Sequence, residues 1–394
     1  MRVALVHDWL TGLRGGERVL EVLAGMYPDA EVFTLVHVRG STSPVIERLR
    51  IHASPLSAIP GVRTHYRKLL PLFPAAIQSF RLDGFDLVLS THHAVAKSIR
   101  IAPHTPHLCY CFTPMRYVYD QADAYLGRGL RRTLSMPLVA ALRRFDRRSA
   151  ARDHVTRFVA ISTTVAERIH RHYGRHAPVV APPVDVDRIR PSGRPPEDFY
   201  LLVGGFVPYK REEIAIEAFR RLGRRLVVAG DGPRRTELSR SAPANVEFVG
   251  RVPDGALAEL YARCRALVYP QEEDFGIVAV EAQAAGRPVI AFSRGGALDS
   301  VLGDRPPERG ATGIFFDVAS AACLAEAITR FEAIEAGFDS HGIRRHAERF
   351  AIPRFRTEIS AEIDRCLANE PDPSPEPGPC VPTPDARATG RNFG

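Results

Sequence analysis

The sequence predicts an α/β protein made of two doubly wound, parallel-sheet domains that face a central cleft. Two observations lead to this prediction. The length of 394 residues exceeds one ordinary domain of about 100–200 residues, which favours two or three domains. Short apolar runs alternate with longer helical patterns, stop at a proline-rich stretch, and then alternate again. Such alternation is typical of βα units around parallel sheets, so each half is expected to be a Rossmann-like domain.

The first domain is expected over residues 1–185. Its strand candidates are the apolar runs RVALVH (2–7), EVFTLV (31–36), DLVLS (86–90), HLCYCF (107–112) and RFVAIS (157–162). The stretch 181–199 then contains prolines that disfavour both helices and central strands, namely Pro182, Pro183, Pro191, Pro195 and Pro196. We interpret this stretch as the link between the domains.

The second domain is expected over residues 186–350. Its strand candidates are FYLLVGG (199–205), RRLVVAGDG (224–232), NVEFVG (245–250), ALVYP (266–270) and RPVIAFS (287–293). The amphipathic segment 351–369 is expected to form a C-terminal helix that packs back across the domains. Residues 370–394 are rich in proline and nearly free of large apolar side chains, so they are expected to form a disordered tail.

The composition excludes several classes of protein. Hydrophobic residues at 45% and charged residues at 25% exclude a disordered, collagen-like or coiled-coil chain. The six cysteines are too irregularly spaced for a disulfide framework or a zinc site, so a reducing compartment is expected. The start, MRVALVHDWL, is too short and too polar for a signal peptide, and no apolar run reaches the ~18 residues that span a bilayer. We therefore expect a cytoplasmic protein, either soluble or bound to a membrane surface.

The segment 269–292 points most directly to a ligand. A strand ends in a loop that carries Glu273, after which Phe275 and Gly276 open a helix with Glu281 in its second turn. Backbone N–H groups at a helix start, beside a glycine that permits close approach, suit a phosphate. Glu273 can accept hydrogen bonds from sugar hydroxyls and Glu281 from ribose hydroxyls. A bare pair of this spacing is more often a solvated loop before a core helix, but the Phe-Gly pair and the flanking strands favour a site for a nucleotide sugar.

The run EEDFGIVAVEA (272–282) resembles the E-x7-E motif of family 4 glycosyltransferases. Further stretches are similar to the O-antigen and exopolysaccharide mannosyltransferase branch of that family, and they include HDWLTGLRGGERVLE (7–21), HYRKLLPLFP (65–74), HHAVAKS (92–98), CYCFTPMRY (109–117), APPVDVD (181–187), VPYKRE (207–212) and GGALDSV (295–301). The resemblance covers residues 1 to about 330. It implies the GT-B fold and transfer of a hexose, mannose from GDP-mannose, with retention at the anomeric carbon.

Two cations follow the first strand of the second domain. Lys210 and Arg211 would face a diphosphate, where negative charge develops as the nucleotide departs. Alternatively they begin a solvated helix face with Glu212 and Glu213 as partners. The resemblance favours Lys210 as the diphosphate ligand, although many members of the family carry an arginine where this chain has Gly205.

A glycine-rich turn in the first domain is the second candidate phosphate contact. Gly15 and Gly16 enter a helix and would let the backbone approach the diphosphate from the opposite wall of the cleft. A Gly-Gly pair can also be a purely structural turn. The turn does not have the GxGxxG spacing, which weakens an NAD-binding interpretation.

A histidine is expected at the cleft after the 86–90 strand. A neutral imidazole there could bond to the transferred sugar or to the attacking hydroxyl, whereas a loop histidine bonded to backbone is the alternative. The resemblance favours His93 over His92, and it makes His93, Lys210 and Glu273 the expected catalytic residues. Relatives often have a histidine where this chain has Phe112.

No metal or cofactor is expected. Asp185 and Asp187 form a DxD pair, but they lie in the proline-rich link without further carboxylates, so we interpret them as a turn element. Cys109 and Cys111 share one face of a strand and are expected in the core. Cations and helix dipoles would then stabilise the leaving diphosphate.

The formal charge of +8 is concentrated in the first half, since residues 1–185 carry +11 and residues 186–394 carry −3. Within 128–157 an apolar stripe of Leu130, Leu134, Leu138, Leu142 and Phe145 lies beside Arg143, Arg144, Arg147 and Arg148; Arg63, Arg67 and Lys68 lie beside another leucine-rich segment. This pattern resembles a membrane-surface element, in which each basic residue contributes about 1 kcal/mol near an anionic leaflet. A core helix with a solvated basic face is the alternative.

These observations predict a retaining glycosyltransferase on the inner face of a bacterial cytoplasmic membrane, with a lipid-linked saccharide as acceptor. Gly205 and Phe112 suggest a first alternative, a non-catalytic scaffold that binds nucleotide sugars. A nucleotide-sugar epimerase of the same fold is a second. Nucleic-acid binding is possible on charge alone and would show steep salt dependence, but no recognised motif supports it, so no nucleic-acid partner is expected.

Overall fold

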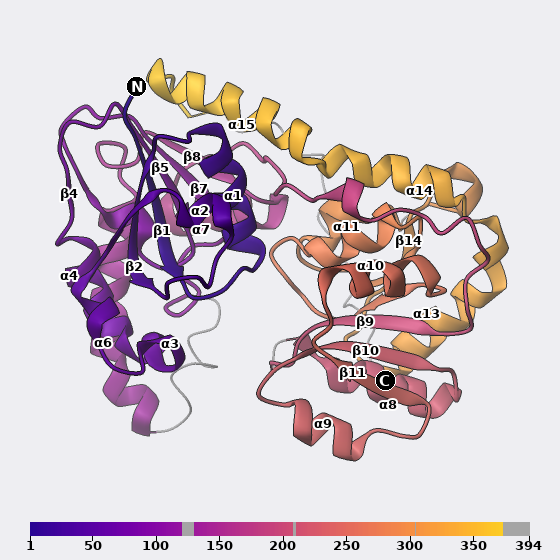
Figure 1. Ribbon diagram of the computed structural model, residues 1–394. Helices are drawn as coiled ribbons and strands as arrows, with labels where there is room; N and C mark the ends of the chain where they lie inside the picture. The colour runs from indigo at the N-terminus through magenta and orange to yellow at the C-terminus, as the bar shows by residue number, and fades with distance from the viewer. Residues whose placement is uncertain (120–129, 208–209, 304, 373–394) are drawn as a thin grey trace, which may run out of the picture.

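The computed structural model describes residues 1–119, 130–207, 210–303 and 305–372. Within these residues the chain forms two parallel sheets of six strands each and a small pair of strands, β4 (Arg81–Leu82) and β6 (Arg100–Ile101). Helices lie on the faces of both sheets (Figure 1). The strands are therefore almost continuously apolar, as expected for sheets that are covered on both faces. The predicted α/β fold class with two Rossmann-like domains is confirmed.

The N-terminal sheet has the strand order β3-β2-β1-β5-β7-β8. Its strands are β1 (Val3–Leu10), β2 (Glu31–His37), β3 (Arg50–Ala53), β5 (Leu87–His92), β7 (His107–Cys111) and β8 (Arg157–Ala160). The chain proceeds from β1 to β2 on one side and later returns to the other side of β1 to form β5, in the register His7↔Thr91. The carboxyl ends of β1 and β5 therefore flank the point where the strand order reverses, which is where doubly wound sheets bind ligands.

The C-terminal sheet repeats this plan in the order β11-β10-β9-β12-β13-β14. Its strands are β9 (Tyr200–Gly205), β10 (Leu226–Asp231), β11 (Val246–Gly250), β12 (Leu267–Tyr269), β13 (Val289–Phe292) and β14 (Gly313–Phe316). Here β9 and β12 flank the reversal point. The sequence patterns did not predict the edge strands β3 and β14, because β3 is half polar and β14 is a run of four residues that begins with a glycine.

The helices of the N-terminal domain are α1 (Gly15–Met26), α2 (Pro44–Glu47), α3 (Val62–His65), α4 (Phe73–Ile77), α6 (Leu130–Arg148) and α7 (Thr163–Tyr173). Those of the C-terminal domain are α8 (Glu212–Leu222), α9 (Arg235–Ser241), α10 (Asp254–Arg263), α11 (Ile277–Ala284), α12 (Ala297–Ser300), α13 (Ala321–Ile334) and α14 (Ser340–Ala347). Of the helices in the described part of the chain, none is both long and apolar enough to cross a bilayer.

The last helix, α15 (Ile352–Leu367), runs from the C-terminal domain along the N-terminal domain (Figure 1). Glu362 in α15 forms a buried ion pair with Arg157 of β8, with a separation of 2.5 Å. The chain crosses between the domains twice at one place, where Val184 and Ala351 form a β-bridge. Asp372 is hydrogen-bonded to Arg175 at 2.9 Å, so the predicted disordered tail does not begin at residue 370; residues 373–394 lie outside the described part.

Candidate active site

A cleft of about 570 Å³ lies between the two domains. Several predicted site residues line it from both sides, namely Gly15, Gly16 and His93 from the N-terminal domain and Lys210, Glu273, Phe275, Gly276 and Glu281 from the C-terminal domain. The volume is that of an ordinary small-molecule site, which ranges from about 300 to 1,000 Å³. The reversal points of both sheets open toward this cleft, so one ligand can contact both domains.

Lys210 and Glu273 meet at the reversal point of the C-terminal sheet. Lys210 follows β9 and Glu273 follows β12, and the Lys210 Nζ atom lies 2.8 Å from Glu273 Oε1. Tyr269 donates a hydrogen bond of 2.8 Å to the other carboxylate oxygen. Burial alone would raise the pKa of Glu273, but the Lys210 ammonium and these hydrogen bonds hold it below its usual value. Glu273 is therefore ionised at neutral pH and able to accept hydrogen bonds from hydroxyl groups.

Gly276 brings the start of α11 close to this pair. It precedes the helix with a φ of +91°, and a Cβ atom at this position would collide with the Tyr269 hydroxyl. The Gly296 N–H donates a 2.8 Å hydrogen bond to the Glu273 carbonyl, which fixes the backbone of the loop that carries Glu273. Only glycine meets both the backbone and the packing requirement at position 276.

Glu281 lies one turn further along α11, at the other end of the cleft. Its carboxylate accepts a 2.8 Å hydrogen bond from the Tyr261 hydroxyl and lies 3.2 Å from Arg188. Burial raises the pKa of Glu281, while Tyr261 and Arg188 oppose the rise. Glu281 thus presents a partly buried acceptor, as the ribose-binding interpretation requires.

Two histidines and a buried aspartate lie at the reversal point of the N-terminal sheet. His93 lines the cleft with a quarter of its side chain exposed, and its Nδ1 atom lies 3.1 Å from Asp8 Oδ2. His7 also lines the cleft and forms a 2.7 Å hydrogen bond with Thr91. Burial lowers the pKa of both imidazoles, that of His7 to about 3. Both rings are therefore neutral at pH 7, as expected for His93; His7 and Asp8 were not predicted.

The glycine-rich turn faces the second domain. Gly15 begins α1, and a Cβ atom there would lie 2.9 Å from the Ile277 side chain of α11. Gly16 lies beside Phe112, whose ring would be 3.3 Å from an added Cβ. The glycines therefore let the starts of α1 and α11 face each other across the cleft.

The prediction that Arg211 faces the donor diphosphate is corrected, because the structure does not bring this residue to the cleft. Its backbone is left-handed, with a φ of +57°, so the chain turns at this residue before α8 begins. The guanidinium lies 5.0 Å from the ring centre of Phe292 and 3.9 Å from the Glu272 carboxylate. Lys210 is thus the cation of the predicted pair that lines the cleft.

An ionic contact between the domains borders the cleft. Asp274, next to Glu273, pairs with Arg116 and with Arg168 of α7, the latter at 2.5 Å. Arg18 of α1 reaches Asp254 of α10 at 2.8 Å. These contacts join residues that lie more than 100 positions apart, so sequence patterns along one segment did not reveal them.

The predicted membrane surface is placed only in part as expected. Arg63, Arg67 and Lys68 are exposed, and Arg67 borders the cleft. Arg143, Arg144, Arg147 and Arg148 lie on the exposed face of α6, although Arg143 also donates a hydrogen bond to the Val118 carbonyl. Of the expected apolar stripe, Leu142 and Phe145 pack at the core, whereas Leu138 is 37% exposed. The side chains of Leu130 and Leu134 lie outside the described part. Membrane binding by this surface stays a prediction.

Two other interpretations can be compared with the structure. Asp185 caps the short turn Val186–Arg188 by accepting the Arg188 N–H at 3.3 Å, in agreement with a turn element. Cys109 and Cys111 are fully buried, as expected for core residues. In the described part of the chain, no three His, Cys, Asp or Glu side chains come together as a metal site would require.

Comparison with known proteins shows what the chain is similar to. Residues 185–348 match the family "Glycosyl transferases group 1". A D-inositol 3-phosphate glycosyltransferase of Rhodococcus opacus is 32% identical over 172 residues, 36% of this chain and 38% of that protein. A GDP-mannose-dependent alpha-mannosyltransferase of Mycolicibacterium smegmatis is 35% identical over 170 residues, 41% and 42% of the two chains. O-antigen chain mannosyltransferase C of Escherichia coli is 32% identical over 116 residues, 28% and 31% of the two chains. The chain thus spans less than half of the length of these relatives.

Solved structures extend the comparison to the whole fold. Anabaena Alr3699/HepE in complex with UDP and glucose superposes with a TM-score of 0.67 at 17% identity, covering 92% of this chain and 99% of that one. WaaG, a glycosyltransferase involved in lipopolysaccharide biosynthesis, gives 0.65 at 20% identity over 92% and 99%. The chain therefore has the GT-B fold, and its C-terminal domain carries the sequence pattern of group 1 glycosyl transferases.

Proposed function

We propose that the protein is a retaining glycosyltransferase that transfers mannose from GDP-mannose to a lipid-linked saccharide in bacterial cell-surface polysaccharide synthesis. The observation that carries the proposal is the Lys210–Glu273 pair, 2.8 Å apart, at the ligand-binding edge of a domain that matches group 1 glycosyl transferases. The names of the two mannosyltransferase relatives support mannose. Relatives that are D-inositol 3-phosphate glycosyltransferases make the acceptor the less supported part.

The residues suggest how the donor binds. Lys210 and the start of α11 at Gly276 would hold the diphosphate, since an ammonium group and free helical N–H groups both stabilise phosphate. Binding replaces the Lys210–Glu273 ion pair by a Lys210–phosphate pair, which leaves Glu273 to accept hydrogen bonds from the sugar. Glu281 would accept hydrogen bonds from the ribose. As the bond to the sugar breaks, Lys210 stabilises the charge on the leaving diphosphate.

The acceptor is expected on the opposite wall. His93 lies there and is neutral, so it can accept a hydrogen bond from a sugar hydroxyl. The basic residues of α6 and the exposed residues Arg63, Arg67 and Lys68 would hold this wall against an anionic membrane at its cytoplasmic face. We further propose that transfer needs no metal ion, because Lys210 and the helix start supply positive charge at the diphosphate. Transfer in excess EDTA tests this point directly.

Donor binding and sugar transfer test the proposal together. GDP-mannose, GDP and UDP-glucose are titrated against the protein by calorimetry, and transfer is followed with radiolabelled donor and membrane extract. Lys210→Ala and Glu273→Ala should each abolish transfer. Glu272→Ala is the matched control, since this neighbouring carboxylate pairs with Arg211 outside the cleft. Donor binding without transfer would favour the scaffold alternative, conversion of free donor the epimerase, and no binding of any donor would refute the site.

A further inference from the structure

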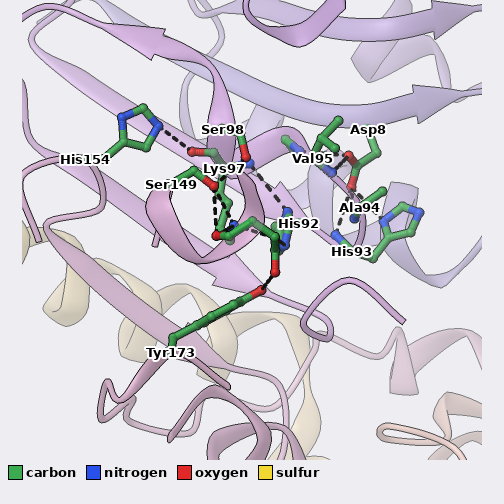
Figure 2. Close-up of polar contacts among 12 residues, drawn as sticks. Asp8, His92, His93, Ala94, Val95, Lys97, Ser98, Ser149, His154 and Tyr173 are labelled. Atoms are coloured by element: carbon green, nitrogen blue, oxygen red, sulfur yellow. Dashed lines mark hydrogen bonds and ion pairs between the residues drawn. The ribbon is translucent and has the colours of Figure 1, made fainter. Parts of the chain in front are cut away.

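Asp8 is a buried carboxylate whose contacts all converge on the turn that carries His93. It is fully buried at the end of β1 and accepts hydrogen bonds from four consecutive backbone N–H groups, those of residues 93–96, at 2.7 to 2.9 Å (Figure 2). Burial alone would raise the pKa of Asp8, but the neighbouring imidazoles and the backbone N–H groups hold it below its usual value. These donors compensate the burial of the charge, so Asp8 is ionised.

The carboxylate also determines which nitrogen of His93 carries the proton. Its Oδ2 atom lies 3.1 Å from His93 Nδ1, and a lone pair on Nδ1 would repel the carboxylate at this distance. A proton on Nδ1 removes the repulsion and leaves the Nε2 lone pair for the cleft. The ring packs edge-on against Trp9, with 4.3 Å between ring centres, and Phe112 lies on another side at 6.2 Å. These neighbours restrict rotation of the imidazole.

A second buried anchor holds the other end of the same turn. Lys97 and Asp146 of α6 are both fully buried, and the Lys97 Nζ atom lies 2.6 Å from Asp146 Oδ1 and 2.8 Å from Ser149 Oγ (Figure 2). Residues 93–98 are therefore fastened to β1 by Asp8 and to α6 by Lys97. Because Lys97 has partners of its own in Asp146 and Ser149, neutralising Asp8 leaves the turn attached at Lys97.

We propose that Asp8 is a positioning residue, which orders the turn 93–96 and holds neutral His93 with its proton on Nδ1, so that Nε2 accepts a hydrogen bond from a sugar hydroxyl in the cleft. The identity of that hydroxyl rests on the proposed function, whereas the tautomer does not. His93 lines the cleft and Asp8 does not, so the effect of Asp8 on transfer passes through the imidazole.

The charges around His93 predict how it titrates. Asp8 and His7 face it from β1, and the guanidinium groups of Arg14, Arg67 and Arg116 act on it from the cleft. Burial lowers the pKa of His93, Asp8 opposes this, and the arginines lower it further. Loss of the Asp8 charge should therefore lower the pKa of His93 again. The acidic limb of the pH–rate profile should move to lower pH even while the rate falls.

The first test reads the tautomer directly in the full-length wild-type protein. Nitrogen-15 NMR of labelled histidine at pH 7.5, with His93 assigned by comparison with His93→Gln, should show a protonated Nδ1 and an unprotonated Nε2. The opposite tautomer or a mixture of both would overturn the proposal. This result holds even if no sugar is transferred, so it distinguishes failure of the inference from failure of the proposed function.

The second test is a double-mutant cycle on transfer. Asp8→Asn and His93→Gln should each lower kcat by about 100-fold, with donor KM little changed, and the double variant should be no slower than His93→Gln alone. Additive losses, or an acidic limb that does not shift in Asp8→Asn, would show a merely structural role and refute the proposal. Should Asp8→Asn fail to fold, the wild-type tautomer decides.

Discussion

Glu212 offers a stability test that needs no substrate. It is the first residue of α8 and is 1% exposed, and neither carboxyl oxygen accepts a hydrogen bond from the side chain or backbone of any other described residue. Burial raises its pKa from 4.5 to about 7, while its own backbone N–H and Lys210 oppose the rise. Glu212 is therefore a buried acid that is neutral below pH 7 and charged above it.

The magnitude follows from proton linkage. Between pH 4.5 and about 7, the folded protein holds a proton on Glu212 that the unfolded chain has lost, so the free energy of unfolding falls as pH rises. At 1.36 kcal/mol per pH unit, the full loss is about 3 kcal/mol. Glu212→Gln keeps the shape and cannot ionise. The stability of this variant relative to wild type should therefore increase by about 3 kcal/mol between pH 4.5 and pH 8.

Urea unfolding followed by far-UV circular dichroism at pH 4.5 and pH 8 measures this difference. Glu213→Gln is the matched control, because Glu213 is the next residue, is 48% exposed and pairs with Arg234 at 2.8 Å. Its change should stay within about 1 kcal/mol at both pH values. If the relative stability of Glu212→Gln is the same at pH 4.5 and pH 8, Glu212 does not titrate as a buried acid and the reasoning is refuted.

Three further outcomes are expected. Gly276→Ala should weaken donor binding, measured by calorimetry, at least about tenfold, because its Cβ would displace the Tyr269 hydroxyl from Glu273. Gly310→Ala controls for backbone strain, since Gly310 has a φ of +81° but open space around it. Asp274→Asn should loosen the contact between the domains and increase the radius of gyration in X-ray scattering, and an unchanged radius would contradict this. The third variant replaces four arginines of α6 by glutamine, at Arg143, Arg144, Arg147 and Arg148. It should bind anionic vesicles more weakly by about 4 kcal/mol at low salt and keep its donor affinity.

The sequence predicts every central strand and two of the four edge strands, β8 and β11, but misses the edge strands β3 and β14. A strand in the middle of a parallel sheet is covered on both faces, so it appears as an apolar run such as residues 2–7 or 86–90. The edge strand Arg50–Ala53 is half exposed and lacks that run. In α6, apolar spacing identified Leu142 and Phe145 but missed Val139, which packs against core residues from distant segments.

The site residues also differ in how well the sequence reveals them. Glu273, Gly276 and Glu281 lie within one strand–loop–helix segment, so their spacing is visible in the sequence. Asp8 and Asp274 were missed because their partners are far away along the chain. A signal for Asp8 was present, however: His7 and Asp8 interrupt the otherwise apolar first strand, where a charge needs a specific partner once the strand is buried.

Both domains carry a pair of polar site residues at the reversal point of their sheet. In the N-terminal sheet they are Asp8, within β1, and His93, directly after β5; in the C-terminal sheet they are Lys210, which follows β9, and Glu273, which follows β12. The two pairs differ in how one of their members, Asp8 or Lys210, is bound. Asp8 is fully buried and faces four backbone N–H groups and the His93 ring, so it holds the turn and the imidazole and does not contact the cleft itself. Lys210 lines the cleft, where it pairs with the Glu273 carboxylate and can exchange that partner for a phosphate. The N-terminal pair is therefore fixed before substrate arrives, whereas the C-terminal pair must separate when the donor binds, and donor binding should change the environment of Glu273 far more than that of His93.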